Sequence, residues 1–269
     1  MSRPFSVEFL QVTAVSKLSP QMRRISFAGD GLAEAITAEP DQQLKLYFPR
    51  PGHSEYPPPA EDFGAWYQGY LSMPEEVRPW MRSYTVRSYD PETCTLDVDF
   101  LLHRHAGPAT RWAIDAQPGD RIGRFGPSAM FGRRIPLSTR LAEADWVLLA
   151  GDESAIPAMS TIIEACSRPM RAFIRSPYEY PMQTWGALDL HWGDPLDAVR
   201  GASLPAGRPF CWLAGEAGLV RDLRRHLVGE RGIARSDIEF TGYWRSTLTQ
   251  DDPPTAADLA DAQELLAQG

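Results

Sequence analysis

Two short apolar runs in the second half of the chain constrain its fold more than any other feature. Trp146–Ala150 and Phe210–Ala214 contain no charged residue, and each is followed by a glycine, Gly151 or Gly215. In both places a helix-like pattern comes next. Short buried strands that alternate with helices are typical of a parallel sheet, so this half is expected to form a doubly wound α/β domain.

Three more strand-like segments fit the same sheet: Arg171–Arg175, Leu188–Trp192 and Asp237–Tyr243. The expected nucleotide-binding domain covers residues 138–250. The acidic residues 251–269 are expected to form an exposed tail, with a short helix from about Ala256 to Gln268.

The first half of the chain has a different pattern, in which short strand-like stretches alternate with Pro and Gly. The six stretches are Phe5–Val15, Met22–Ala28, Gln43–Phe48, Arg82–Ser88, Thr95–Leu102 and Asp120–Phe125. They predict an antiparallel six-stranded β-barrel over residues 1–137. The loop Pro49–Pro79, rich in Pro, Gly and aromatic residues, is either a cover over a site or a disordered insertion.

Composition excludes several classes of function. The net charge is −8, with 15 basic and 16 acidic residues up to Leu137 and 12 and 19 from Ser138 onward, so nucleic acid is not an expected partner. Three cysteines are too few for a four-thiolate iron–sulfur cluster, so redox chemistry would need an organic cofactor. No long apolar run and no signal-peptide pattern are present, which predicts a cytoplasmic protein without a membrane span.

The segment Arg82–Arg87 has the side chains that a flavin nucleotide needs. On a strand, Arg82 and Tyr84 share one face, since side chains alternate. The arginine can hold a diphosphate while the tyrosine packs on a ring or a ribityl chain, and Thr85 supplies a hydroxyl and an N–H for a ring nitrogen. The alternative is an exposed strand with two solvated arginines.

A second segment, Asp97–His103, leads from a strand into Gly107-Pro108, a good helix start. The free N–H groups of that first turn, with Thr110, would suit a pyrophosphate, although simple loop-to-helix punctuation explains the residues equally well. His103 and His105 would share one face of a strand, but no third ligand follows at a recognisable spacing, so no metal site is expected.

Two turns in the second half follow predicted strands and begin predicted helices. Gly151–Ser154 and Ala214–Glu216 are placed like nucleotide-binding turns, although no G-x-G-x-x-G is present and a purely structural turn is the alternative. Arg175 ends a predicted strand where an acidic residue would favour a ribose hydroxyl. An arginine there favours the 2′-phosphate of NADPH.

Taken in order, these motifs resemble the siderophore-interacting protein family, the FAD-dependent ferric-siderophore reductases of the ferredoxin-reductase-like superfamily. The resemblance extends from about Phe5 to Arg245. The matching segments are Arg82–Arg87, His103 with Gly107–Ala113, Gly126-Pro127, Leu149–Ala158, Trp212–Glu216 and Gly242–Arg245.

The resemblance implies cofactor-binding residues in both domains. For FAD they are Arg82, Tyr84, Thr85, Asp99, Phe100, Leu101, His103, Ala109 and Thr110. For the turns beside the flavin and the nicotinamide they are Asp152, Ser154, Ala155, Arg175, Glu216, Tyr243 and Trp244. Arg104 and His105 stand where the family often has small or polar residues, and longer side chains near the adenine or diphosphate would alter FAD affinity. His191–Asp194 departs from the family's usual strand end, so the choice between NADH and NADPH stays open.

The implied activity is electron transfer from NADPH or NADH through FAD to Fe(III) in a ferric siderophore, with a ferredoxin as a further candidate partner. Many siderophores are anionic, so Lys45, Arg124 and Arg245 are candidates for a local basic pocket. Trp244 would stack on an aromatic chelator or pack in the domain interface. The alternatives are a general NAD(P)H:flavin or ferredoxin-type reductase with a protein or quinone acceptor, and a non-catalytic siderophore-binding protein.

Overall fold

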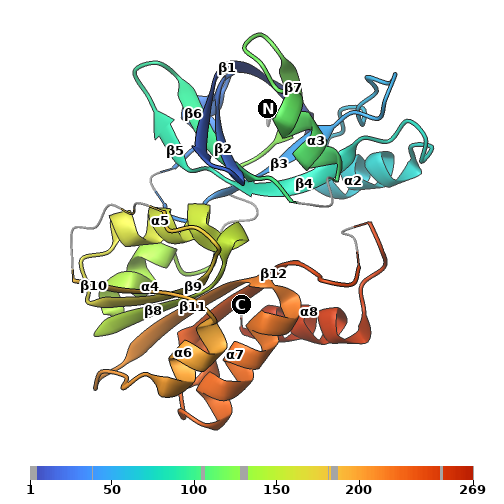
Figure 1. Ribbon diagram of the computed structural model, residues 1–269. Coiled ribbons are helices and arrows are strands. Elements are labelled where there is room, and N and C mark those ends of the chain that lie inside the picture. The colour runs from blue at the N-terminus through green and yellow to red at the C-terminus, as the bar shows by residue number, and fades with distance from the viewer. Residues whose placement is uncertain are drawn as a thin grey trace. The chain divides into compact units, whose positions relative to one another are not determined.

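The computed structural model describes residues 5–37, 39–103, 107–127, 133–180, 182, 187–248 and 251–268. The chain divides into two compact units, Met1–Phe131 and Gly132–Gly269 (Figure 1). None of the described helices is both long enough and apolar enough to cross a membrane.

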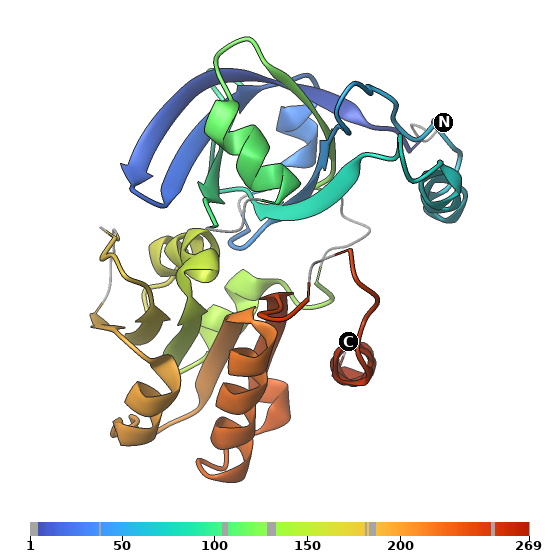
Figure 2. The ribbon, with the colours of Figure 1, turned by 45° about the vertical axis from the view of Figure 1, so that its right-hand side comes forward.

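The first unit is built on one antiparallel sheet that curves around its core (Figures 1 and 2). Its strands are β1 (Glu8–Ser19), β2 (Met22–Ala28), β3 (Gln43–Phe48), β4 (Trp80–Thr85), β5 (Ser88–Asp90), β6 (Thr95–Leu101) and β7 (Arg121–Phe125). They lie in the order β4-β3-β7-β1-β2-β6-β5. The expected antiparallel sheet is confirmed, but the expected count of six strands is not, because this sheet has seven.

The sequence pattern predicts one strand over Arg82–Ser88. The structure has two strands there, β4 and β5, and this adds the seventh strand. The N–H of Val86 donates to the carbonyl of Gln42 beside β3, whereas the N–H of the next residue, Arg87, donates to the carbonyl of Asp97 on β6. β4 and β5 are the two edge strands of the sheet, so the chain passes here from one edge to the other. We call this crossing the seam.

Three helices accompany this sheet: α1 (Leu32–Ala35), α2 (Phe63–Ser72) and α3 (Pro108–Asp115). The segment Pro49–Pro79, expected as a loop, contains α2. The side chain of Asp62 caps this helix by accepting the N–H of Ala65 at 2.8 Å. The buried ring of Trp66 stacks on Phe125 at 4.5 Å, so α2 packs against β7.

The second unit contains a parallel sheet with helices on both faces (Figures 1 and 2). Its strands are β8 (Trp146–Asp152), β9 (Met170–Arg175), β10 (Leu188–Trp192), β11 (Pro209–Glu216) and β12 (Ile238–Trp244). Their order is β10-β9-β8-β11-β12, and all neighbours are parallel. The expected doubly wound sheet is confirmed. The strand order reverses between β8 and β11, and ligands of such sheets bind at the carboxyl ends beside this reversal.

The helices of this unit are α4 (Leu137–Glu143), α5 (Ile156–Ala165), α6 (Pro195–Gly201), α7 (Ala217–Gly229) and α8 (Ala256–Gln268). α6 and α7 lie side by side on one face of the sheet, and α5 lies on the other (Figures 1 and 2). Leu219, Leu223 and Leu227 recur every four residues on α7 and are buried against the sheet. The apolar stripe of α7 thereby fixes where its N-terminus meets the end of β11.

Candidate functional site

The carboxyl ends of β8 and β11 approach each other so closely that only glycine fits. A Cβ added to Gly151 would lie 1.9 Å from the carbonyl oxygen of Ala214. Gly215 has φ +134°, and a Cβ there would lie 2.7 Å from the carboxyl carbon of Asp152. The two glycines therefore allow the backbones to meet at the strand-order reversal, where a ligand is expected.

The Asp152 carboxylate binds the ends of three neighbouring strands together. It is 4% exposed. One oxygen accepts the N–H of Ser154 at 2.9 Å and its hydroxyl at 2.5 Å. The other accepts the N–H of Glu216 at 2.7 Å and the indole N–H of Trp244 at 2.9 Å. Asp152, Ser154, Glu216 and Trp244 are thus brought together, with the carboxylate bound by the protein's own donors.

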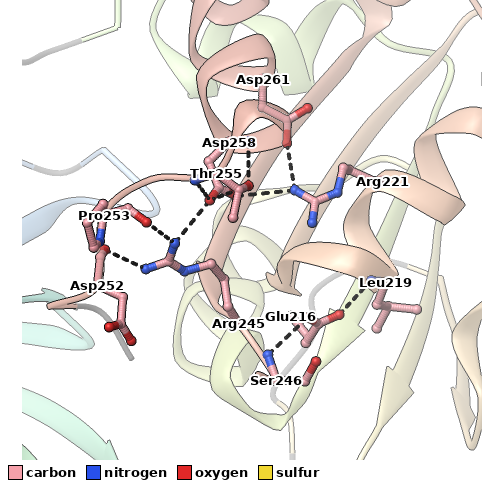
Figure 3. A network of polar contacts seen from close by, with 10 residues as sticks. All are labelled: Glu216, Leu219, Arg221, Arg245, Ser246, Asp252, Pro253, Thr255, Asp258 and Asp261. Carbon is pink, nitrogen blue, oxygen red and sulfur yellow. Dashed lines mark hydrogen bonds and ion pairs between the residues drawn. The ribbon is translucent and has the colours of Figure 1, made fainter. Parts of the chain in front are cut away.

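The remaining residues expected in this region differ in their access to a ligand. Ala155 is fully buried, so its side chain cannot reach one. The Glu216 carboxylate caps α7 by accepting the N–H of Leu219 at 2.8 Å, and it also accepts the N–H of Ser246 at 3.2 Å (Figure 3). Tyr243 is half-buried near the end of β12.

Glu153, which was not among the residues expected from the sequence, has a carboxyl group suited to a ligand at these strand ends. Burial, and then the charge of Asp152, raise its pKa. Its Oε2 is buried without a hydrogen-bond partner among the described atoms. A buried carboxyl oxygen in this state can accept a hydroxyl or amide hydrogen from a ligand. The only signal in the sequence was the Gly-Asp-Glu-Ser turn itself.

Arg175 lies at the carboxyl end of β9, as expected. Its guanidinium forms an ion pair with Asp194, which caps α6 by accepting the N–H groups of Leu196 and Asp197 at 3.0 and 3.1 Å. The Arg175 side chain remains 48% exposed. The helix cap therefore positions this cation at the sheet edge while leaving it accessible.

In the first unit, Tyr84 lies on β4 just before the seam and packs against the core. Its ring lies 4.4 Å from that of Phe100 on β6, at an angle of 39°. Burial raises the pKa of the Tyr84 hydroxyl, which therefore stays protonated and able to donate a hydrogen bond. Arg82 and Thr85, on the same strand, are half-buried. One Arg82 N–H donates to the carbonyl of Met81 at 2.9 Å.

Asp99 is held by arginines rather than being available to a ligand. Arg24, its partner across β2 and β6, donates two hydrogen bonds to it at 2.7 and 2.9 Å, and Arg87 lies at 3.9 Å. The strand around Asp99 is expected to lie along the flavin, and this stays a prediction, but the Asp99 carboxylate is already bound by the protein. Sequence reasoning missed Arg24 and Arg87, because their pairing depends on strand register.

The first turn of α3 begins at a residue that cannot cap it. The N-cap, Gly107, has no side chain to accept a hydrogen bond, and Pro108 follows it. Thr110 is 3% exposed, and Ala109 packs against the core that also contacts Tyr84. Uncapped N–H groups at a helix N-terminus suit an anion such as a diphosphate, so this turn fits FAD.

The other residues expected in this region are placed less tightly. Leu101 is half-buried at the end of β6, and His103 is exposed just after it. Arg104 and His105 lie outside the described residues.

Two of the expected substrate residues, Lys45 and Arg124, lie on this sheet and differ in burial and in their partners. Lys45 is half-buried on β3 and hydrogen-bonds to the hydroxyl of Ser83, and burial lowers its pKa. Arg124 is 2% exposed, pairs with Glu8 and donates to the carbonyls of Gly126 at 2.6 Å and Asp30 at 3.2 Å. A guanidinium buried in this way contacts protein rather than substrate, so Arg124 is withdrawn from the candidates.

The third expected substrate residue, Arg245, is bound by the C-terminal segment (Figure 3). It donates to the carbonyl oxygens of Asp252 at 2.9 Å and Pro253 at 3.0 Å, and to the carboxylate of Asp258 at 3.1 Å. Thr255 and Asp258 cap α8 reciprocally, since each side chain accepts the other's N–H. The expected helix is present, and most of its described residues are exposed as expected, but arginines of the second unit also hold it in place.

Both units match known protein families. Residues 11–131 match the siderophore-interacting FAD-binding domain, and residues 144–247 match the siderophore-interacting protein domain. The chain is 28% identical over 256 residues to the mycobactin import ATP-binding/permease protein IrtA of Mycolicibacterium smegmatis, but it spans only 27% of that protein's length.

Two other relatives match along most of their length. The chain is 29% identical to the ferric vibriobactin reductase ViuB of Vibrio cholerae, over 90% of this chain and 89% of ViuB. It is 28% identical to the NADPH-dependent ferric-chelate reductase of Escherichia coli, over 88% of this chain and 92% of the relative.

Solved structures agree with these matches. The crystal structure of a siderophore utilization protein from T. fusca superposes with a TM-score of 0.72 at 29% identity, covering 93% of this chain and 97% of the other. The ferredoxin reductase of carbazole 1,9a-dioxygenase, at 17% identity and a TM-score of 0.61 over 91% of this chain and 71% of that one, shows the same ferredoxin-reductase-like fold. Because both units are matched in order, the chain belongs to the siderophore-interacting protein family.

Proposed function

We propose that this protein is an FAD-dependent reductase that transfers electrons from NAD(P)H to Fe(III) in a ferric siderophore and releases Fe(II) for use in the cytoplasm. The observation that carries the proposal is the match of both units, along nearly the whole chain, to relatives named as ferric reductases. The contacts in each unit support it independently.

In the first unit, two features are suited to FAD. The N–H groups of Ala109 and Thr110 would bind the diphosphate, with the Arg82 guanidinium as its cationic partner. The protonated Tyr84 hydroxyl would donate a hydrogen bond to the flavin or its ribityl chain. The hydroxyl or the N–H of Thr85 would hydrogen-bond to a ring nitrogen of the flavin. Bound flavin supplies the step-down that this reaction needs, since it accepts a hydride and passes on electrons singly.

In the second unit, the strand-order reversal would receive the nicotinamide nucleotide. The buried Oε2 of Glu153 would accept a hydrogen from the ribose or the carboxamide, beside Ser154, Glu216 and Tyr243. Arg175 favours the 2′-phosphate of NADPH, in agreement with the coenzyme named for the Escherichia coli relative. We therefore propose NADPH as the preferred donor.

Iron reduction itself requires no acid, base or nucleophile from the protein. An oxygen cage holds Fe(II) less tightly than Fe(III), so one electron loosens the siderophore's grip. The chain's own contribution would be to orient the chelate. Lys45 in one unit and Arg245 in the other are separate candidates for that contact.

Anaerobic titration of the purified yellow protein with each nicotinamide tests the proposal. We expect NADPH to bleach the flavin absorbance more efficiently than NADH, and a ferric siderophore to restore it. A flavin that neither nicotinamide bleaches but a reduced ferredoxin does would favour the ferredoxin-type alternative. Protein that is colourless and does not take up FAD would favour the siderophore-binding alternative.

A further inference from the structure

The cation expected to attract an anionic substrate is already bound by the protein's own C-terminal segment. Arg245 lies just beyond β12, and three oxygen atoms of residues 252–258 lie within 3.1 Å of its guanidinium nitrogens. One of these oxygens belongs to the Asp258 carboxylate. Hydrogen bonds from Thr255, followed by Arg221 and Arg245, lower the pKa of Asp258 to about 2, so this carboxylate is ionised at neutral pH. The charge of Arg245 is therefore partly compensated, by a carboxylate that it shares with Arg221.

The groove beside Arg245 is lined by several acidic residues. A groove of ≈ 380 Å³ lies between β12 and α8, and its lining includes Arg245 together with Asp252, Asp258 and Asp261. Tyr243 and Trp244 supply part of the remaining wall. The one guanidinium in this lining, that of Arg245, already has a carboxylate partner in Asp258, while Asp258 and Asp261 also pair with Arg221. The aromatic wall suits a ligand of low charge.

Neighbouring arginines are compensated by the same helix. Arg221 on α7 lies 3.3 Å from Asp258 and 3.2 Å from Asp261 (Figure 3). Arg224 and Arg235 both pair with Glu264. Three carboxylates of α8 thus pair with four arginines, and each of these arginines, Arg245 included, has a carboxylate partner on this helix.

We propose that the C-terminal segment determines which substrate charge is preferred: by pairing Arg245 with Asp258 in an acidic groove, it directs the protein to ferric chelates of low net charge, such as trishydroxamates. Three hydroxamates bind Fe(III) as a neutral complex, whereas three catecholates give a trianion. The trianion meets Asp258 and its acidic neighbours at close range, and the neutral complex does not. This inference rests on the proposed function and names the substrate class for it.

The test compares Asp258→Asn with the native protein. The gallium(III) complexes of a cyclic trishydroxamate and of a hexadentate tris-catecholate have the same charges as the iron complexes but cannot be reduced. Their Kd values are measured by quenching of tryptophan fluorescence, and kcat/KM is measured with the ferric complexes. We expect the native protein to bind the neutral complex more tightly. Asp258→Asn should tighten binding of the trianion roughly three- to tenfold, and by less at high ionic strength, while changing the neutral complex by less than about twofold.

Two variants control for charge and for structure. Glu264→Gln removes the same charge from the same helix without contacting Arg245, and Asp258→Glu keeps the charge at the tested position. Both should retain the native selectivity. The inference is overturned if the native protein prefers the trianion, if Asp258→Asn leaves the ratio of Kd values unchanged, or if Glu264→Gln shifts it equally. Failure of the native protein to reduce either ferric complex would instead overturn the proposed function, whatever the gallium complexes show.

Discussion

The Asp152 carboxylate in the second unit and the first turn of α3 in the first unit, both at places where ligands are expected, differ in whether the protein itself supplies their hydrogen-bond partners. At the strand-order reversal of the second unit, both oxygens of the Asp152 carboxylate are bound by the protein's own donors. At the first turn of α3 in the first unit, the N-cap residue, Gly107, has no side chain with which to cap the N–H groups. A saturated group holds structure, while an unsatisfied one in a well-packed place is available to a ligand. The difference separates residues that shape the protein from residues that would bind its cofactor.

The largest loss of stability is expected at Gly151, where the backbones of β8 and β11 approach each other most closely. In Gly151→Ala, the added methyl group would meet the carbonyl of Ala214, so β8 and β11 would have to separate. We expect a loss of at least about 3 kcal/mol in the free energy of unfolding, measured with urea. Gly201→Ala is the matched control, because nothing lies within 4 Å of its added Cβ. Equal stability of the two variants would contradict the close strand approach.

The Asp152 carboxylate should be almost as sensitive. Asp152→Asn would turn an amide N–H₂ toward a donor, since the native carboxylate receives hydrogen bonds on both oxygens. A loss of about 2–3 kcal/mol is expected, with altered Trp244 fluorescence. Asp189→Asn, at an exposed surface pair, should cost less than about 1 kcal/mol. A stable Asp152→Asn protein with reduced NADPH affinity alone would make Asp152 a ligand-binding residue instead.

In the first unit, a change at Arg82 is expected to weaken FAD binding rather than the stability of the fold. Arg82→Ala removes the proposed cationic partner of the diphosphate, so the Kd for FAD should rise roughly 30-fold or more and the purified protein should lose its yellow colour. Unfolding of the apoprotein should change little. Arg225→Ala, in an exposed pair on α7, serves as control. An Arg82→Ala protein that stays fully yellow would remove this residue from the site.

A designed cap tests the uncapped turn of α3 directly. Gly107→Asp would place a carboxylate at the N-cap, where nothing lies within 4 Å of the added Cβ and the backbone is already extended. The apoprotein should gain about 0.5–1 kcal/mol, while FAD binding should weaken roughly tenfold because the carboxylate competes with the diphosphate. Gly107→Ala should do neither. Tighter FAD binding in Gly107→Asp would place the diphosphate elsewhere.

The smallest effect should come from Glu153, through pH. Its pKa is raised in the folded protein, so folding favours the protonated form. The native stability should therefore fall as pH rises from the ordinary value near 4.5 through the raised pKa, and Glu153→Gln should lack this component. Paired thermal melts from pH 4 to 8 measure it. A difference between the proteins that is constant with pH would show that the pKa of Glu153 is the same in the folded and the unfolded protein.

The repetitive parts of the fold were predictable from the sequence, because local patterns determine them. The apolar runs of the second unit marked β8 and β11 in a parallel sheet. The seam was not predictable, since Val86 and Arg87 look like a continuing strand and differ only in which distant carbonyl each N–H meets. Long-range pairing of backbone groups leaves no local trace in the residues.

The candidate site divides in the same way. The places of Tyr84, Thr110 and Arg175 on a strand, at a helix start and at a strand end were predictable, because their neighbours in sequence suggest these elements. The burial of Arg124 depends on its partner Glu8, on a different strand, so it was missed. The docking of α8 was missed too, although Thr255 and Asp258, three residues apart, do carry the local signature of a helix cap.

The most direct test of the central claim is to count Fe(II). Native protein with FAD is mixed anaerobically with NADPH and a ferric trishydroxamate, and Fe(II) is trapped by a ferrous-specific chelator. Since a hydride carries two electrons and each Fe(III) accepts one, we expect two Fe(II) for each NADPH oxidised over many turnovers. Oxidation of NADPH without Fe(II), or with a quinone or a protein as the only effective acceptor, would contradict the assignment as a ferric-siderophore reductase.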